Sequence, residues 1–287
     1  MRNVHSSRRN FLAATGLTLA GLSSLRGVRL QAALLQDKPR LQLGIQLYSL
    51  RDYKLDQALQ HAADIGFSQV EFYSGMLPLD ASPEIIAATK QRVADLGMSI
   101  SSHGVNHVGS DQKANRKLFD FAKALGVKSV TIDPDPDAFD HLDDLVKEYD
   151  IRAAIHNHGP NHRYNKVVDV LKAIEGHDER IGACADLGHY IRSGESATEV
   201  IRLLKGRLYG IHLKDFSAME DKAKGVILGK GHLDVPGVVD ALVSVGFPAD
   251  GALSLEYEEN PQDPIADITA CYAIAKSAVD KVNQAAS

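Results

Sequence analysis

The feature of this sequence that most constrains its fold is a regular alternation of short apolar runs with longer stretches of helical periodicity. The run at 127–132 has the length and branched side chains of a buried strand, whereas the stretch at 55–65 spaces its apolar residues as a helix does. The expected strands are 41–47, 70–72, 98–102, 127–132, 151–155, 180–186, 207–212 and 252–256. The expected helices are 55–65, 83–96, 111–125, 136–149, 164–175, 195–204, 235–245 and 261–282.

Eight strand–helix pairs without a second compositional block predict one parallel sheet closed into a (β/α)₈ barrel, the TIM barrel. An open doubly wound sheet is the alternative, and it requires a glycine-rich phosphate-binding turn after an early strand. The segment Leu47-Tyr-Ser-Leu-Arg-Asp52 is not such a turn, and Gly229-Lys-Gly231 comes too late in the chain. We therefore expect an α/β barrel over residues 37–287, a length that single barrels commonly have.

The amino-acid composition limits the classes of molecule that this chain is expected to bind. A net charge of -5 and a pI near 6.2 give no electrostatic reason to expect nucleic acid. Of the two cysteines, Cys184 and Cys271, the first lies inside an apolar run two residues before Asp186, which predicts a buried free thiol. Cysteine content therefore does not identify the cellular compartment.

The first 36 residues have the order of regions found in export signals. Ser7-Arg8-Arg9-Asn10-Phe11-Leu12 precedes a weakly apolar stretch that runs to about Leu25, and no acidic residue comes before Asp37. The paired arginines resemble a twin-arginine signal, and the apolar part is too short for a membrane anchor. A basic tail without a targeting role is the alternative. We expect residues 1–36 to be an export signal and linker, and the protein to be periplasmic or exported.

The last four expected strands each end in a side chain that binds metals or transfers protons: His156, Asp186, His212 and Glu256. In a closed barrel the carboxyl ends of the strands share one mouth, so these side chains should meet there. An isolated histidine at a strand end is usually structural, but four such ends in succession favour a metal site. Two imidazoles and two carboxylates suit Mn²⁺ first, with Co²⁺, Zn²⁺, Fe²⁺ or Mg²⁺ as alternatives.

At these residues the chain resembles the xylose isomerase-like TIM-barrel family, which contains sugar isomerases, sugar and inosose epimerases and dehydratases, and relatives of endonuclease IV. The resemblance covers about Leu41 to the C-terminus. Its carrying segments are His156-Asn-His-Gly159, Asp186-Leu-Gly-His189, Gly210-Ile-His-Leu-Lys-Asp215, Gly229-Lys-Gly231 with Asp234, and Leu255-Glu-Tyr-Glu258. In that family Glu, Asp, His and Glu hold one divalent metal. His156 departs from this pattern, because it replaces a Glu that forms half of the acid/base pair in the epimerases.

The strand-end positions and the resemblance together assign further roles. Glu256 is expected to act as the base as well as a metal ligand, and His158 as a second acid or base. Substrate contacts are expected from Glu71, His103, His189 and Lys214. Each of these four has a structural alternative: a surface acid for Glu71, packing for His103, orientation of Asp186 for His189, and an ion pair for Lys214.

The resulting prediction is a metal-dependent sugar isomerase or epimerase that removes a proton next to a carbonyl group and passes through an enediolate. One alternative is a metal-dependent lyase that acts on 3-keto-glycosides by β-elimination. Another is a sugar-binding protein without catalytic activity. The expected partner is a small carbohydrate, without nucleic acid or a membrane anchor, and a homo-oligomer remains open. A DNA-repair endonuclease is disfavoured by the acidic balance and the export signal.

Overall fold

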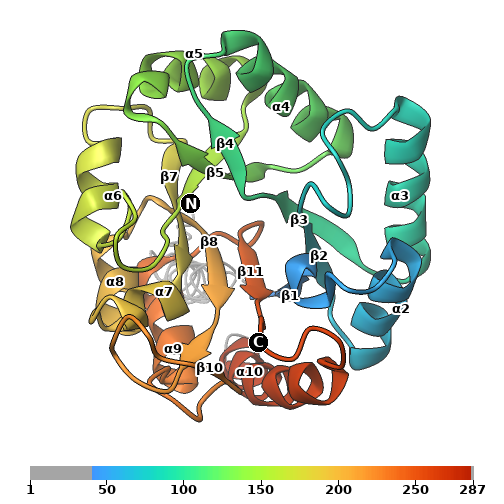
Figure 1. Cartoon of the computed structure of the whole chain (residues 1–287), viewed down its shortest axis with the longest axis vertical. Coiled ribbons are helices and arrows are strands. Elements are labelled where there is room, and N and C mark those ends of the chain that lie inside the picture. Colours follow the sequence, from blue (N-terminus) through green and yellow to red (C-terminus); the bar gives the residue numbers. More distant parts are fainter. Residues whose placement is uncertain (1–40, 286–287) are drawn as a thin grey trace, which may run out of the picture. The chain divides into compact units, whose positions relative to one another are not determined.

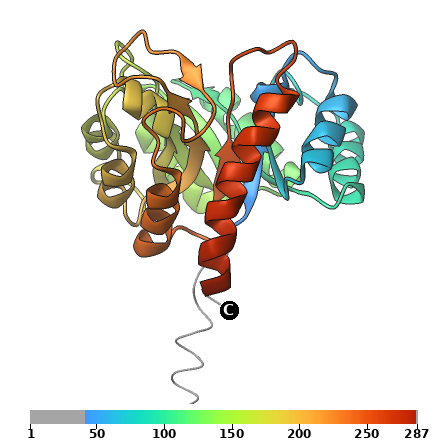
Figure 2. The same ribbon diagram turned by 90° about the horizontal axis from the view of Figure 1, so that it is seen from below.

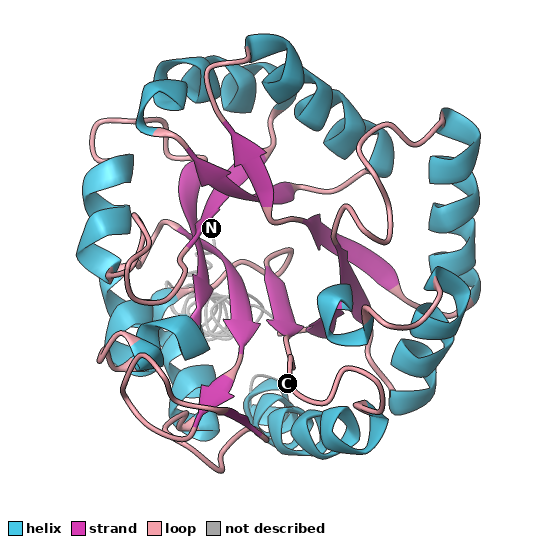
Figure 3. Ribbon diagram, viewed as in Figure 1, coloured by secondary structure: helices cyan, strands magenta, loops and turns pink. Residues whose placement is uncertain are grey.

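The computed structural model of the 287-residue chain describes residues 41–285, and the expected export signal and linker lie outside them. The expected TIM barrel is confirmed: a ring of parallel strands is surrounded by helices (Figures 1 and 3). None of the helices within 41–285 is long and apolar enough to cross a membrane.

Nine strands form the parallel sheet, in the order β3-β2-β1-β11-β8-β7-β6-β5-β4. They are β1 (Leu43–Gln46), β2 (Gln69–Phe72), β3 (Ser99–His103), β4 (Asn106–Val108), β5 (Ser129–Pro134), β6 (Arg152–His156), β7 (Ile181–Asp186), β8 (Leu208–Leu213) and β11 (Ala252–Leu255). A separate antiparallel pair joins β9 (Asp215–Phe216) to β10 (Gly225–Val226).

The sheet has nine strands rather than the expected eight because the third barrel strand is divided. Its first part, β3, pairs with β2, and its second part, β4, pairs with β5. Between them the chain passes so close to β5 that a Cβ on Gly104 would lie 2.3 Å from the carbonyl oxygen of Thr131. Side chains complete the ring at this point, since Ser102 and Asn106 both donate hydrogen bonds to β5 carbonyl groups.

The eight expected helices are all present, with ends shifted by a few residues. They are α2 (Leu55–Ile65), α3 (Pro83–Asp95), α4 (Gln112–Leu125), α5 (Phe139–Tyr149), α6 (Val167–Ile174), α8 (Ala197–Leu203), α9 (Val235–Val245) and α10 (Ile265–Ala285). The prediction missed one short helix, α7 (Leu187–Arg192), and two 3₁₀ turns, η1 (Leu47–Leu50) and η2 (Pro136–Ala138). Figure 2 shows α10 packed along the outside of the barrel.

Local chemistry explains the helix limits, as α4 shows. The carboxylate of Asp111 accepts hydrogen bonds from the backbone of Lys113 and Ala114, which leaves fewer amide groups unpaired at the start of the helix. Gly126 ends the helix with a left-handed backbone (φ 87°) and donates its N–H to Ala122. Such signals lie in the sequence itself, which is why these limits were predictable.

The inside of the barrel is more polar than its outer layer. Alternate residues of each strand, such as Val70, Ile132 and Ile211, belong to the apolar core. The intervening residues Glu71, Thr131 and His212 are buried as well, and their side chains contact one another. Branched apolar residues usually fill the interior of such barrels. A buried ionisable network in their place indicates a functional centre.

Candidate metal and substrate site

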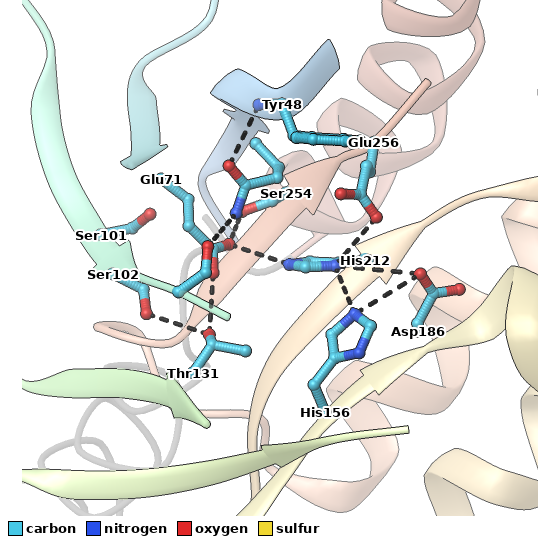
Figure 4. A network of polar contacts seen from close by, with 12 residues as sticks. Tyr48, Glu71, Ser101, Ser102, Thr131, His156, Asp186, His212, Ser254 and Glu256 are labelled. Carbon is cyan, nitrogen blue, oxygen red and sulfur yellow. Dashed lines mark hydrogen bonds and ion pairs between the residues drawn. The ribbon is translucent and has the colours of Figure 1, made fainter. Parts of the chain in front are cut away.

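Four of the predicted side chains meet at the mouth of the barrel (Figure 4). One ligand atom from each of His156, Asp186, His212 and Glu256 lies within 4.8 Å of the others, and all four side chains are buried. His212 Nδ1 is 3.1 Å from His156 Nε2 and 3.2 Å from Glu256 Oε2. Asp186 Oδ2 lies 3.7 Å from His156 Nε2 and 3.9 Å from His212 Nδ1. We call these residues the four-donor group.

Strand register places the four-donor group. His156 ends β6, and Asp186 at the end of β7 is paired with His212 of β8. Glu256 directly follows β11, where its N–H bonds the carbonyl group of Leu213. Asn157 fixes the backbone of Asp186 from both sides: its Oδ1 accepts the Asp186 N–H at 2.8 Å, and its Nδ2 donates to the Asp186 carbonyl at 3.0 Å.

The spacing and chemistry of the four-donor group fit a divalent cation. Nitrogen and oxygen ligands lie about 2.0–2.2 Å from such an ion, so neighbouring ligands are about 3.0–3.5 Å apart. Burial, reinforced by His212, lowers the pKa of His156 well below its usual value, so this imidazole is neutral and has a free lone pair. Asp186 Oδ2 is buried and accepts no hydrogen bond of good geometry. This oxygen has an ion pair with Lys214 at 2.9 Å, and an ion shared by the four would give it a ligand bond as well.

Lys214 supplies positive charge beside the four-donor group. Its ammonium group is buried and lies 2.6 Å from Glu256 Oε2, 2.9 Å from Asp186 Oδ2 and 3.0 Å from Glu258 Oε1. Burial alone would lower the pKa of Lys214, but these carboxylates raise it well above its usual value. Burial would likewise raise the pKa of Glu256, yet Lys214 and His212 hold it well below its usual value. The carboxylate is therefore ionised and the lysine is protonated.

Glu71 lies beneath the four-donor group and contacts it through His212. Its Oε2 is 3.2 Å from His212 Nε2 and accepts a hydrogen bond from Ser254 at 2.7 Å, while Thr131 donates to its Oε1 at 2.8 Å. Burial alone would lower the pKa of His212, but Cys184, Glu256 and Glu71 raise it well above its usual value, so without a cation the ring carries a proton on both nitrogens. A cation would displace the proton of Nδ1, and Glu71 would keep the proton of Nε2, so that the Nδ1 lone pair faces the other donors. Glu71 is 0% exposed. This geometry fits a residue that orients His212.

A pocket of about 330 Å³ opens next to the four-donor group. Three further predicted residues, His158, His189 and Lys214, line this pocket together with His156 and Glu256. His103 lies elsewhere: its Nε2 hydrogen-bonds the carbonyl oxygen of Leu77, and its ring packs against Phe121. The structure thus brings seven of the nine predicted site residues together directly and an eighth, Glu71, through His212. It places the ninth, His103, in the wall of the barrel.

A second set of candidate ligands, Asp133, His158 and His162, lies at the rim of the pocket and is less buried. The Nδ1 atom of His162 accepts the N–H of Tyr164, so the neutral ring carries its proton on Nε2, the atom that faces Asp133 at 3.4 Å. A protonated nitrogen is not a metal ligand. The four-donor group is therefore the stronger metal site.

Several residues of the site were not singled out from the sequence. Tyr48, Tyr73 and Gln46 line the pocket. Tyr48 and Tyr73 follow the first two strands at their carboxyl ends, so strand-end position was a usable signal for both. Thr131, inside a strand, offered no such signal. The prediction that Cys184 is a buried free thiol is confirmed, and Cys271 is also buried and free.

Comparisons with known proteins agree with this architecture. A family model described as xylose isomerase-like TIM barrel matches residues 59–273. The 3-oxo-isoapionate decarboxylase of Pectobacterium atrosepticum is 27% identical over 198 residues, which make up 63% of this chain and 68% of that relative.

Solved structures also match. An uncharacterised protein of Parabacteroides distasonis is 28% identical, with a TM-score of 0.65 over 83% of this chain and 99% of that chain. A D-psicose 3-epimerase is 15% identical, with a TM-score of 0.62 over 84% of this chain and 97% of that chain. The epimerase likeness shows the fold alone. The family match covers most of the barrel, and the chain belongs to the xylose isomerase-like TIM barrel family.

Proposed function

We propose that this protein is a metal-dependent sugar isomerase or epimerase that removes a proton next to a carbonyl group and passes through an enediolate. The observation that carries the proposal is the four-donor group: its ligand atoms lie within 4.8 Å of one another beside a pocket that His156 and Glu256 also line. Family membership and the epimerases among its structural neighbours support a sugar substrate.

A divalent ion held by the four-donor group, Mn²⁺ in the first instance, would supply a Lewis acid for the carbonyl oxygen and the neighbouring hydroxyl group of a sugar. Glu256 is the proposed base, since it is ionised and faces the pocket. Proton transfer by a positioned group typically contributes about 10²- to 10⁴-fold to the rate. Lys214 stays protonated and would stabilise negative charge that develops on a substrate oxygen.

His158 is the proposed second acid or base. Burial lowers the pKa of His158, so its imidazole is neutral near pH 7 and can accept a proton from the substrate. It lies on the pocket wall together with His189, whose pKa burial lowers to about 4. His189 and Lys214 are the proposed substrate contacts. Glu71 is proposed to support the site from behind through His212, whereas His103, which contacts Leu77 and Phe121, is proposed to have a packing role in the barrel wall.

The test is solvent-deuterium incorporation. Mn²⁺-loaded protein is incubated in D₂O with a panel of keto sugars, and incorporation is followed by mass spectrometry. We expect exchange at carbon next to the carbonyl group, and its loss after chelation or in Asp186→Asn. Asp250→Asn is the matched control, because Asp250 pairs with Arg152 at the amino ends of the strands. Sugar binding that survives chelation without any exchange would instead identify a binding protein.

A metal-dependent lyase acting on 3-keto-glycosides is the second candidate. His156 stands where the family has Glu, so an acid/base pair of two carboxylates is not present in its usual form. The named decarboxylase relative acts on a 3-oxo compound, which points to chemistry beside a ketone. Elimination and epimerisation share the first proton transfer and differ in the next step. Release of the aglycone from a 3-keto-glycoside would establish the lyase, and exchange without release would exclude it.

We also propose that the protein is exported to the periplasm, on the grounds of the paired arginines at 8–9 and the apolar stretch that follows them. Export by that route moves folded proteins, so the metal would be loaded before export. Fractionation of cells that produce the full chain tests this: the protein should be periplasmic, and Arg8→Lys with Arg9→Lys should retain it in the cytoplasm.

A further inference from the structure

The pocket has two chemically different walls. One wall is ionic and carries the reacting groups: His156, His158, His189, Lys214, Glu256 and Glu258. The other comes from the ends of β1, β2 and β3 and consists of Gln46, Tyr48, Tyr73, Ser74, Gly104 and Val105. Tyr48 and Val105 are 39% and 36% exposed, so this second wall reaches the rim. The ionic wall offers charged and hydrogen-bonding groups to the hydroxyl groups of a sugar, whereas the second wall offers two aromatic rings and the side chain of Val105 to an apolar group.

Tyr48 and Tyr73 form an aromatic corner. Their ring centroids are 5.3 Å apart, and the ring planes meet at 85°. Among residues 41–285, neither hydroxyl group has a hydrogen-bond partner, and both side chains line the pocket. Rings in this arrangement can take a further ring edge-on or offset-stacked, and such aromatic pairs add affinity beyond buried area.

The aromatic corner is held in place by the ionic half of the site. Arg51 lies over the ring of Tyr48, 4.6 Å from its centroid, and donates to the carbonyl group of Glu258 at 2.8 Å. The N–H of Tyr257 bonds Ser49 Oγ at 3.0 Å. On the other side, Gly75 supports Tyr73: a Cβ at this position would lie 2.4 Å from the tyrosine ring. A surface that is fixed before binding loses less entropy when a ligand docks.

We propose that the aromatic corner binds the aglycone of a glycoside, and that this aglycone is aromatic or otherwise apolar. The sugar ring then occupies the ionic wall, and the glycosidic bond lies between the two. The inference rests on the proposed function, because it assigns the sugar to the four-donor group. It narrows the substrate class from sugars in general to glycosides with an apolar aglycone.

Calorimetric binding to the Mn²⁺-loaded protein tests the proposal, with phenyl and methyl β-D-glucopyranoside as the two probes. Neither probe carries the carbonyl group that the reaction requires, so turnover adds no heat. The phenyl glycoside should bind about 2- to 10-fold more tightly than the methyl glycoside. Tyr48→Ala and Tyr73→Ala should each reduce this ratio toward 1. Tyr48→Phe and Tyr73→Phe keep the rings and should retain it.

Equal affinity for the two probes, or binding of neither, would overturn the aromatic-corner proposal. An unchanged ratio in both alanine variants, shown by circular dichroism to be folded, would overturn it as well. The proposed function fails by a separate measurement, the absence of deuterium exchange in keto sugars. Tighter binding of the phenyl glycoside without deuterium exchange would therefore support the aromatic-corner proposal and reject the proposed function. Deuterium exchange with equal binding of the two glycosides would support the proposed function and reject the aromatic-corner proposal.

Discussion

The two halves of the barrel differ in how completely their buried polar side chains are hydrogen-bonded. In the half built from β1 to β5, Glu71 and His103 have their polar atoms occupied by protein groups such as Ser254, Thr131 and Leu77. Among residues 41–285, buried side-chain atoms without a hydrogen-bond partner are more numerous in the half built from β6 to β11, although Gln69 Oε1, Asn106 Oδ1 and Asp133 Oδ1 of the other half are unpaired too. Five of the eight such atoms within residues 41–285 are His156 Nδ1, His158 Nδ1, Asp186 Oδ2, His189 Nδ1 and the hydroxyl of Tyr190.

This difference distinguishes the half that would support the site from the half that would carry out the reaction. A buried polar group without a hydrogen bond costs about 1–3 kcal/mol. One of these atoms, Asp186 Oδ2, belongs to the four-donor group, while the unpaired nitrogens of His156 and His189 are Nδ1 and the Nε2 of each ring faces Asp186. This distribution fits the proposed roles, in which the β1–β5 half would support the site and the β6–β11 half would bind the cation and the substrate. The predictions below test this division, from the largest effect to the smallest.

Lys214→Met should lower the free energy of unfolding of the metal-free protein by about 3–5 kcal/mol, because it leaves a cluster of buried carboxylates without their counter-charge. Mn²⁺ should restore much of this loss, since it binds the same carboxylates. Urea unfolding with and without Mn²⁺ measures both. Lys276→Met, which breaks an exposed helical pair with Asp280, should cost less than about 1 kcal/mol. Equal stability of Lys214→Met and the parent protein would contradict the assigned charge balance.

Asp186→Asn should reduce Mn²⁺ affinity by more than about 100-fold, because the loss of a ligand exceeds the 10- to 100-fold effect typical of residues behind the ligands. Its amide can still accept the N–H of His189, as the carboxylate does at 2.8 Å, so the fold should persist. Calorimetric titration measures the affinity, with Asp250→Asn as control. An affinity within threefold of the parent protein would remove Asp186 from the metal site.

Glu71→Gln tests whether a residue of the β1–β5 half affects metal binding by the four-donor group. We expect Mn²⁺ affinity to fall about 10- to 100-fold. Gln is a weaker hydrogen-bond acceptor for His212 Nε2 than Glu, so the ring would be held less firmly with Nδ1 toward the metal. Nitrogen NMR of the His212 ring gives a second measurement, since it reports which nitrogen carries the proton. Unchanged affinity together with an unchanged tautomer would reduce Glu71 to a packing role.

His103→Gln should change the pH dependence of stability and leave metal affinity unchanged. Burial lowers the pKa of His103 below its unfolded value of about 6.5. As the pH falls below that value, the unfolded chain binds the proton first, so stability decreases toward acid. The variant should lack this contribution, which is at most about 1.4 kcal/mol per pH unit. Unfolding curves between pH 7 and pH 5 measure the slope, and parallel slopes would argue against a neutral His103.

The expected elements matched the structure wherever their signals were local. The helix at 55–65 and the helix at 235–245 have the predicted limits because glycine follows each of them and apolar spacing runs to the last turn. The third strand shows the limit of such signals. Its continuation as β4 depends on how closely Gly104 approaches Thr131, a contact between segments that are distant in the sequence.

The residues of the site likewise fall into those that the sequence predicted and those that only the structure placed. The sequence alone determined the order of strands and the identity of the residues at their ends, because hydrophobic periodicity and residue chemistry are properties of short segments. Only the tertiary structure decided that Glu71 lies behind His212, that His103 faces Leu77, and that Tyr48 and Tyr73 meet at the pocket. The physical reason is that barrel closure sets distances between strands, and a side chain's neighbours across the barrel leave no pattern in its own segment.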